Sequence, residues 1–383
     1  MVDAGSSKNI LIIAPRMLTP DIDAASLRLY HLLGVLRDLS YTVTFIPSFA
    51  GSWPPYDSRL QEDTERLRQA GVEVPSSSNI DPIEDHLQRN GKRYTIAILC
   101  DEYVASKHIA IVRKHCPQSI VVFDTSDVHY VRHYREAKVT GNVRALRRAM
   151  QSKKRALAVA READFTFVVS QADRAILERD CPEVRTHVIS SIHEVHGCAK
   201  PFSDRQDIVF VGSFQHSPNL DAAHYFVGEI QPLLREEIVG IRTYIIGGDP
   251  PDSVQELACR DVIVTGYVPD LAPYFDSCRL SVAPVRFGAG IKGKVLTSLS
   301  YGLPVVASSM AIEGLHLTDG QDVLVADNPT AFCEAVASLY RDETLWNQLS
   351  KNGLEVVAQH FSFAAVRAEL AHWLRSMESA QGQ

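Results

Sequence analysis

Hydrophobic and polar residues follow two different periods along the first part of the chain. Residues 9–14 form a continuous apolar run, as expected for a strand that is buried on both faces of a parallel sheet. Apolar residues then recur at helical spacing over residues 25–39, and residues 42–47 are predicted to form the next strand. This strand–helix–strand order predicts a βαβ unit in a doubly wound sheet.

The same alternation continues to the end of the chain, with one interruption. Further strands are predicted at residues 95–99, 119–123, 165–169, 207–211, 242–246, 262–264, 279–283, 305–307 and 322–325, and a last helix at residues 364–377. Turn-forming residues predict loops at residues 51–55 and 76–78. The period is lost over residues 193–206. This predicts a linker between an N-terminal domain (residues 1–192) and a C-terminal domain (residues 207–362), followed by a helix within residues 363–383.

Length and composition narrow the class of protein. The 383 residues suffice for two domains with separate cores, and a net charge of −7 argues against general nucleic-acid binding. The seven scattered cysteines form no C-x-x-C pair, so we expect neither a zinc site nor a disulfide framework, which fits a reducing cytoplasm. We expect no signal peptide in the short polar N-terminus, and no apolar run is long enough to span a bilayer.

The most informative stretch lies in the second half of the chain. Residues 284–307 read P-V-R-F-G-A-G-I-K-G-K-V-L-T-S-L-S-Y-G-L-P-V-V-A, a glycine-rich loop that opens a short helix before the next strand. Backbone N–H groups at a helix N-terminus stabilise an anion, and Gly288 and Gly290 let the backbone approach a ligand closely. Arg286, Lys292 and Lys294 add positive charge, which predicts a phosphate or diphosphate site. The alternative is a tight turn with solvated lysines.

This stretch resembles the nucleotide-sugar loop of family-four glycosyltransferases, in the branch that reads R-F-G-A-G-x-K-G-K-x-L-E-A-x-x-Y-G-x-P-V-V. The chain departs from that string at Thr297, where the family has glutamate, and at Ala289, where the wider family has a second glutamate. The resemblance implies that the basic side chains of the loop bind diphosphate. It also implies that Gly288, Ala289, Gly290 and Ile291 present backbone amides to the donor. Thr297 would hydrogen-bond the nucleotide ribose, less strongly than a carboxylate would.

Other segments of the second half extend the resemblance. Residues 210–222 follow the family's F-V-G-S-x-x-x-x-P-N-x-D-A motif, and residues 266–271 follow its G-x-V-x-D-L turn, which lies against the nucleotide base. The further residues implied in donor binding are Gly212, Ser213, Gly247, Gly248, Tyr267, Val268 and Glu313. Many relatives carry an Arg and a Lys after the first of these glycines. This chain lacks both, so the basic residues of the glycine-rich loop would have to supply the charge.

Two loops of the first half resemble the same family. Residues 20–28 read P-D-I-D-A-A-S-L-R, similar to the family's P-D-x-D-A-G-S-x-R loop, which faces the cleft. Asp21, Asp23, Ser26 and Arg28 are therefore candidates for contacts with the acceptor or the donor phosphate. The alternative for Asp23 or Ser26 is to cap the helix that follows.

Residues 123–135 read F-D-T-S-D-V-H-Y-V-R-H-Y-R and resemble the family's V-D-T-x-D-V-H-x-x-R-x-x-R segment. We therefore take Asp124, Asp127 and His129 as candidates for acceptor chemistry. A general base among them would need hydrogen-bond reach to the acceptor hydroxyl and a suitable pKa. Capping of the next helix is an equally good interpretation of Asp127.

Residues 144–161 are strongly basic, from Arg144 to Arg161. A solvated helix is the favoured interpretation, and a patch that contacts a membrane surface is the alternative.

The resemblance covers nearly the whole chain and implies the GT-B architecture, two Rossmann-like domains facing a cleft with a last helix that returns to the first domain. The expected function is transfer of a sugar from a UDP- or GDP-sugar to a hydroxyl of a saccharide, lipid-linked, protein or small-molecule acceptor. The resemblance also implies retention at the anomeric carbon and no metal. We expect a cytoplasmic enzyme with no nucleic-acid partner and at most a peripheral membrane contact. The two missing glutamates leave a non-catalytic relative that regulates a transferase as one alternative, and a nucleotide-sugar epimerase is another.

Overall fold

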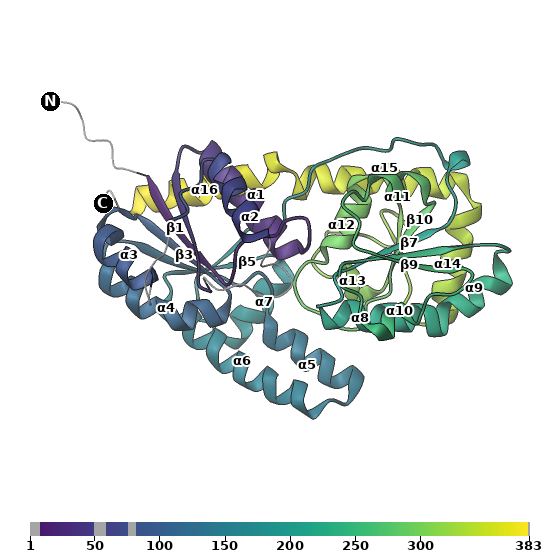
Figure 1. The fold of residues 1–383 in the computed structure, drawn as a ribbon, viewed down its shortest axis with the longest axis horizontal. Coiled ribbons are helices and arrows are strands. Elements are labelled where there is room, and N and C mark those ends of the chain that lie inside the picture. Colours follow the sequence, from purple (N-terminus) through teal and green to yellow (C-terminus); the bar gives the residue numbers. More distant parts are fainter. Residues whose placement is uncertain (1–7, 50–58, 76–81, 382–383) are drawn as a thin grey trace. The chain divides into compact units, whose positions relative to one another are not determined.

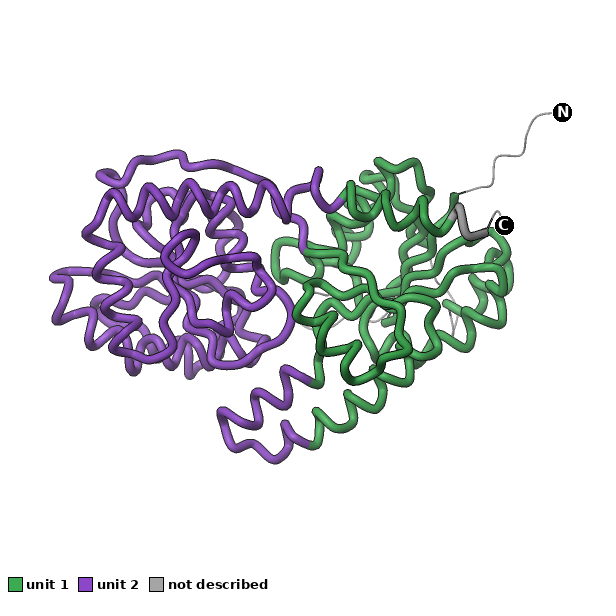
Figure 2. The backbone as a smooth tube through the Cα atoms, turned by 180° about the vertical axis from the view of Figure 1, so that it is seen from behind, with its two compact units in different colours: residues 1–130, 147–190, 367–383 green, residues 131–146, 191–366 purple. Residues whose placement is uncertain are grey.

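The computed structural model describes residues 8–49, 59–75 and 82–381. The loops predicted at residues 51–55 and 76–78 lie outside the described residues. The chain divides into two compact units, which Figure 2 colours green and purple. Unit 1 comprises residues 1–130, 147–190 and 367–383, and unit 2 comprises residues 131–146 and 191–366. Residues 131–146, which the sequence pattern groups with the N-terminal half, therefore make most of their contacts within unit 2.

Unit 1 contains a parallel six-stranded sheet in the order β2-β1-β3-β4-β5-β6 (Figure 1). Its strands are β1 (Asn9–Ala14), β2 (Thr42–Pro47), β3 (Ile96–Cys100), β4 (Ile120–Asp124), β5 (Phe165–Val168) and β6 (Thr186–Val188). Every residue of β3 is buried, as a strand covered by helices on both faces requires. The strand order reverses between β1 and β3, so the loops after these strands open at the switch point of the sheet.

The helices of the first half are α1 (Ala24–Asp38), α2 (Leu60–Gln69), α3 (Pro82–Asn90), α4 (Glu102–His115), α5 (His129–Thr140), α6 (Val143–Glu162) and α7 (Gln171–Asp180), with a short turn η2 (Gly91–Arg93). The last helix, α16 (Phe363–Gln381), also contributes to the core of unit 1. Its Trp373 is buried, with ring centroids 4.8 Å from Phe167 and 5.7 Å from Phe165. The C-terminal helix therefore packs against β5.

Unit 2 contains a second parallel six-stranded sheet, in the order β12-β11-β10-β7-β8-β9. Its strands are β7 (Ile208–Val211), β8 (Thr243–Ile246), β9 (Val262–Gly266), β10 (Leu280–Ala283), β11 (Val305–Ala307) and β12 (Leu324–Val325). The first strand of the unit, β7, pairs with its second and fourth strands, β8 and β10. This is the strand order of a dinucleotide-binding sheet, with the switch point between β7 and β10.

The helices of unit 2 are α8 (Ser217–Tyr225), α9 (Gln231–Glu237), α10 (Asp252–Gln255), α11 (Ala272–Ser277), α12 (Gly293–Ser300), α13 (Ser309–Ile312), α14 (Pro329–Arg341) and α15 (Glu343–Val356), with turns η3 (Phe202–Asp204), η4 (Phe226–Ile230) and η5 (Val357–Phe361). Helix α14 begins at Pro329, because the Asn328 side chain accepts a hydrogen bond from the Ala331 N–H and Pro329 occupies the first turn.

The doubly wound α/β fold predicted from the sequence is confirmed, and the predicted strands agree with the observed ones to within two residues. Strand β6 was not predicted, because its three residues are only partly buried and carry no clear pattern. Helix α15 was not predicted either. Its buried face consists of Trp346, Leu349, Ser350 and Gly353, so two of the four positions are not apolar. Within the described ranges, no helix combines the length and apolar character needed to cross a bilayer.

Candidate active site

The loops after β7 and β10 open beside each other, because these two strands are neighbours at the switch point of unit 2. Gly212 follows β7 and Gly247 follows β8. A Cβ atom on Gly247 would lie 2.0 Å from the Gly212 carbonyl oxygen, and a Cβ atom on Gly212 would lie 2.8 Å from Cγ of Asn219. Only glycine fits at either position, so the two predicted residues form a tightly packed edge of the loop region.

The glycine-rich loop between β10 and α12 is packed into unit 2. Phe287 and Ala289 are almost fully buried, and the Ser308 hydroxyl donates a 2.6 Å hydrogen bond to the Val285 carbonyl. Gly290 has a φ of +64°, which side chains other than glycine rarely adopt. Lys292 is the N-cap residue of α12 and is only 9% exposed. The alternative of an ordinary turn with solvated lysines is therefore wrong for Lys292.

Two predicted lysines of this loop are held in place by oxygen atoms. Nζ of Lys292 donates a 2.9 Å hydrogen bond to the Gly290 carbonyl and lies 3.7 Å from a carboxylate oxygen of Glu313. Nζ of Lys294 donates to Oδ1 of Asn219 and lies 4.6 Å from the centre of the Phe210 ring. Burial lowers the pKa of the Lys294 ammonium to about 7. Lys294 is therefore close to half protonated at neutral pH.

Arg286 has different surroundings. Its side chain is 39% exposed, forms hydrogen bonds of 2.8 and 2.5 Å to the Asp221 carboxylate, and lies over the Tyr225 ring. A diphosphate would therefore have to compete with Asp221 for this guanidinium. The Arg286 guanidinium is therefore less available for the predicted phosphate contact.

Sequence reasoning missed a further cation, Arg135 of α5, which belongs to the same unit 2. Its guanidinium donates 2.6 and 2.7 Å hydrogen bonds to both oxygens of the Glu313 carboxylate and a 2.8 Å bond to the Gly288 carbonyl. Burial alone would raise the pKa of Glu313, but the hydrogen bonds from Arg135 and the nearby Lys292 lower it below its usual value. Arg135 is the last arginine of the R-x-x-R pattern in residues 132–135, which could have indicated it.

The remaining predicted donor residues are distributed around this cluster. The Thr297 hydroxyl donates a 2.9 Å hydrogen bond to the Gly293 carbonyl of its own helix, a bond common for threonine inside helices. Ile291 packs against the core of unit 2, whereas Tyr267 is 46% exposed. Ser213, Gly248 and Val268 also belong to unit 2. The carbonyl of Ser213 accepts a hydrogen bond from the side-chain amide of Asn219. A Cβ atom on Gly248 would lie 3.8 Å from Cβ of Tyr267, which is an ordinary contact distance. Val268 packs against the cluster that contains Phe275.

In unit 1, two predicted acceptor residues are in contact with each other. Nε2 of His129 lies 3.1 Å from a carboxylate oxygen of Asp127, and its Nδ1 lies 3.6 Å from a carboxylate oxygen of Asp101. Asp101 has a φ of +76°, and its side chain accepts a hydrogen bond from the Tyr103 N–H at the start of α4. The imidazole therefore lies between two carboxylates, an arrangement that suits proton transfer.

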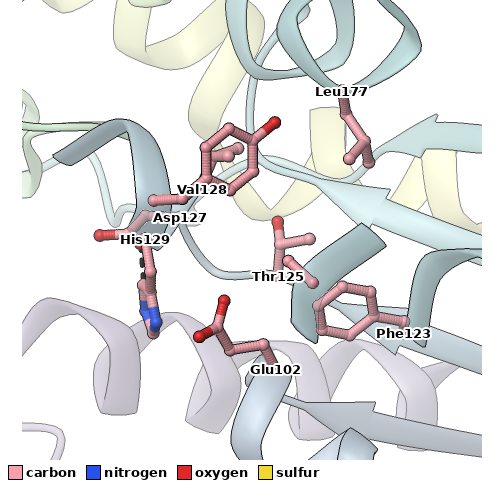
Figure 3. A pocket seen from close by; sticks show the side chains of 9 residues that line it. Glu102, Phe123, Thr125, Asp127, Val128, His129 and Leu177 are labelled. Atoms are coloured by element: carbon pink, nitrogen blue, oxygen red, sulfur yellow. Dashed lines mark ion pairs between the residues drawn. The ribbon is translucent and has the colours of Figure 1, made fainter. Parts of the chain in front are cut away.

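A small cavity adjoins this group, and Figure 3 shows Asp127, His129 and Glu102 along its wall. Burial raises the pKa of Glu102, although the Ser152 hydroxyl donates a 2.7 Å hydrogen bond to its carboxylate and opposes the shift. The cavity measures about 10 Å³, the space of about one water molecule. It can hold a water beside His129 but not a sugar ring, so an acceptor could meet Asp127 and His129 only from outside this cavity.

The predicted residues Arg28 and Asp124 form a buried ion pair in unit 1. Hydrogen bonds of 2.8 and 3.1 Å join the guanidinium of Arg28 to the carboxylate of Asp124, and Arg28 also donates to the Ile189 carbonyl. Both side chains are at most 4% exposed. A carboxylate so buried and so fully paired does not reach an acceptor hydroxyl. We therefore correct the expectation for both residues and assign the pair to holding α1 against β4.

The predicted cap of α1 is observed. Asp23 accepts hydrogen bonds of 2.8 Å from both the N–H and the hydroxyl of Ser26, and Arg16 pairs with the same carboxylate at 2.9 Å. Asp21 instead pairs with Arg59 of the segment that begins α2, at 2.8 Å. Capping thus accounts for Asp23 and Ser26 without a ligand. In the part of the chain that the structure describes, no three His, Cys, Asp or Glu residues are grouped so that they could hold a metal ion.

Comparisons with known proteins identify the class to which this architecture belongs. Residues 205–342 match the family model described as Glycosyl transferases group 1. Sucrose-phosphate synthase from Thermosynechococcus elongatus has a similar fold, with a TM-score of 0.71 and 15% identity over 97% of this chain and 100% of that one. HepE from Anabaena, solved with UDP-glucose, has a TM-score of 0.72 and 14% identity over 96% and 99% of the two chains.

One curated protein is similar in sequence to part of this chain. An uncharacterized 44.6 kDa protein in the cps region of Klebsiella pneumoniae is 19% identical over 177 residues, which is 44% of each chain. These matches agree with the resemblance seen in the sequence motifs. The chain has the GT-B fold, and its residues 205–342 are similar to the family described as Glycosyl transferases group 1.

Proposed function

We propose that this protein transfers a sugar from a nucleoside-diphosphate sugar to a hydroxyl acceptor. The observation that carries the proposal is the cluster of Lys292, Lys294 and Arg135 beside the glycine-rich loop, within the unit that holds the matched domain. These side chains and the N–H groups at the start of α12 would bind the diphosphate. Glu313 would give up its hydrogen bonds to Arg135 or would contact hydroxyl groups of the sugar.

In the proposed reaction, the bond between the anomeric carbon and the diphosphate oxygen breaks, and a bond from that carbon to the acceptor oxygen forms on the same face. The acceptor proton passes to the departing diphosphate. The nucleoside diphosphate leaves with the electron pair, and the buried cations stabilise its charge. Because protein cations would meet this charge, we propose that no metal ion is required.

A UDP-sugar is the first donor to test. A structural neighbour, HepE, was solved with UDP-glucose, and GDP-sugars are the second choice. The relative in the cps region supports polysaccharide synthesis as the setting, with a saccharide or a lipid-linked saccharide as acceptor and a hexose as the transferred sugar. A peripheral membrane contact of residues 144–161, given above as the alternative to a solvated helix, would be compatible with a lipid-linked acceptor.

The test begins with binding. UDP and GDP should raise the apparent melting temperature of the protein, because a ligand that binds only the folded state stabilises it by mass action. Nucleotide release from UDP- and GDP-hexoses is then measured with mixed acceptors, with and without EDTA. Acceptor-dependent release of nucleotide that survives EDTA is the expected result. Binding of neither nucleotide, together with no release, would refute the proposed function.

The threonine at position 297 supports a second candidate function, that of a non-catalytic relative that binds nucleotide. Its hydroxyl is bonded to Gly293, so this position offers the ribose less than a glutamate would. Thr297→Glu should tighten UDP or GDP binding if this residue faces the ribose. Tighter binding without any turnover, in wild type and variant alike, would favour the non-catalytic protein. Unchanged binding in a folded variant would remove the ribose role of Thr297.

A further inference from the structure

The charge of this chain is distributed very unevenly. Residues 137–161 contain eight Lys and Arg residues and no Asp or Glu, although the whole chain has a net charge of −7. The segment therefore carries +8, and the rest of the chain carries −15. Most of it forms a single continuous helix, α6, which spans Val143–Glu162 (Figure 1). Such a contrast within an acidic protein indicates a surface for a negatively charged partner.

Part of this charge is neutralised within unit 1. Lys153 pairs with Asp180 at 2.9 Å, Arg155 with Glu102 at 3.2 Å, and Arg161 with Glu183 at 2.7 Å. These pairs lie toward the C-terminal half of α6. Arg144 and Arg147 of its N-terminal half are exposed, and so is Lys154. The excess positive charge is therefore concentrated on the solvent side of α6.

The same side of α6 exposes large apolar side chains. The helix packs through its small residues Ala145, Ala149, Ser152 and Ala156, which are all buried. On the opposite side, Val143 is 63% exposed, Leu146 is 41% exposed and Met150 is 69% exposed. Val143, Arg147, Met150 and Lys154 follow one another at positions i, i+4, i+7 and i+11, so they form one face. Apolar and basic side chains alternate along that face.

We propose that this face of α6 binds the surface of a bilayer that contains anionic lipids. Basic side chains would contact the headgroups, and Val143, Leu146 and Met150 would enter the boundary between headgroups and acyl chains. A merely solvated helix explains the arginines but not two large exposed apolar side chains, Val143 and Met150, on the same face and a third, Leu146, on its flank. A soluble acidic polymer would likewise use the charges and gain little from those apolar groups. The inference does not depend on the proposed transferase activity.

The experiment is co-sedimentation of the full-length protein with vesicles of phosphatidylcholine alone or of phosphatidylcholine mixed with phosphatidylglycerol. Wild type should bind only the anionic vesicles, and added salt should weaken the binding. Arg147→Glu with Lys154→Glu should reduce the partition coefficient by at least about fivefold for each residue, as expected for a basic residue near an anionic surface. Arg89→Glu with Lys351→Glu is the control, because it makes the same change in net charge at exposed positions on α3 and α15.

A second variant tests the apolar contribution without changing the charge. Leu146→Ser with Met150→Ser should lose most of the binding to anionic vesicles and keep its binding to dextran sulfate, with circular dichroism showing that α6 remains folded. Three outcomes would overturn the proposal. These are no binding of wild type to anionic vesicles, equal loss in the charge control, and full vesicle binding by the serine variant. The last outcome would point to a soluble polyanion.

Discussion

Lys292 and Lys294 are separated by one residue, yet their surroundings give them different roles in the proposed donor site. Lys292 lies between the Gly290 carbonyl, which accepts its hydrogen bond, and a carboxylate oxygen of Glu313. Lys294 faces the Phe210 ring and one amide oxygen, which cannot compensate for lost hydration. The sequence shows two equivalent basic residues, and only their neighbours in the folded chain distinguish them.

The first prediction concerns Lys292. Lys292→Ala should weaken binding of UDP or the UDP-sugar by about 1.5–3 kcal/mol, the contribution of a hydrogen bond to a charged group. Isothermal titration calorimetry at constant pH measures this change, with Lys351→Ala in α15 as the control. An unchanged dissociation constant in a folded Lys292→Ala protein would show that Lys292 does not contact the diphosphate.

The second prediction is a pH dependence. Since burial lowers the pKa of Lys294 to about 7, this residue loses its proton as the pH rises above 7. A diphosphate binds the protonated form more tightly, so the affinity for a UDP-sugar should fall as the pH rises from about 7 toward 9, by up to about tenfold per unit. The free energy of unfolding should instead rise over the same pH range, because Lys294 keeps its proton in the unfolded chain and has lost it in the folded one.

The pH dependence is measured as the dissociation constant of a UDP-sugar at several pH values. Lys294→Met should bind more weakly at pH 6 and should no longer respond to pH in this range. Lys292→Ala, which leaves Lys294 intact, should still respond. The same slope in wild type and Lys294→Met would assign the titration to another group.

At the scale of elements, a segment distant in sequence completes the glycine-rich loop. Arg135 of α5 bonds the Gly288 carbonyl and the Glu313 carboxylate, so it fixes both the loop and the residue after α13. The sequence predicted each of these segments separately. It could not predict that they meet, because neither composition nor period specifies which helix covers the loop.

The third prediction tests this link. Arg135→Ala should weaken UDP-sugar binding by at least about tenfold, because it removes one cation and leaves the Glu313 carboxylate close to the diphosphate. Arg135→Ala combined with Glu313→Ala should recover part of the loss. A double-mutant cycle on the dissociation constants measures the coupling. Additive effects of the two substitutions would contradict the link, and the folded state is checked by circular dichroism.

At the scale of the whole molecule, the two units have separate hydrophobic cores. Trp373 of α16 packs on Phe165 and Phe167 in unit 1, whereas Trp346 of α15 packs near Phe202 and is 1% exposed in unit 2. Each core is formed by one sheet and its helices, and unit 1 also needs the C-terminal residues of the chain. The two units can therefore differ in stability.

The fourth prediction concerns the separate stabilities of the two units. Trp373→Ala should destabilise unit 1 and Trp346→Ala should destabilise unit 2, each by about 3–5 kcal/mol, as large core truncations do. Hydrogen exchange followed by mass spectrometry reports on each unit separately. UDP should slow exchange in unit 2 of the Trp373→Ala protein, because the proposed donor site lies in that unit. Protection confined to unit 1 would place the nucleotide site elsewhere.

The sequence by itself determined the alternation of strands and helices, and with it the two doubly wound sheets. Apolar runs such as residues 9–14 are local patterns, and burial on both faces leaves them no other place than the middle of a sheet. The sequence also indicated the glycine-rich loop, because glycines, lysines and the start of a helix are adjacent along the chain.

The tertiary structure decided which of the candidate residues are available for chemistry. Asp124 and Arg28 lie 96 positions apart in the sequence and form an ion pair in the core. Their charges suggested contacts with a ligand, but both side chains are buried and already paired with each other. Arg135 became part of the proposed donor site for the converse reason, since it joins a loop more than 150 positions away. Partners and burial depend on long-range contacts, which a local pattern does not record.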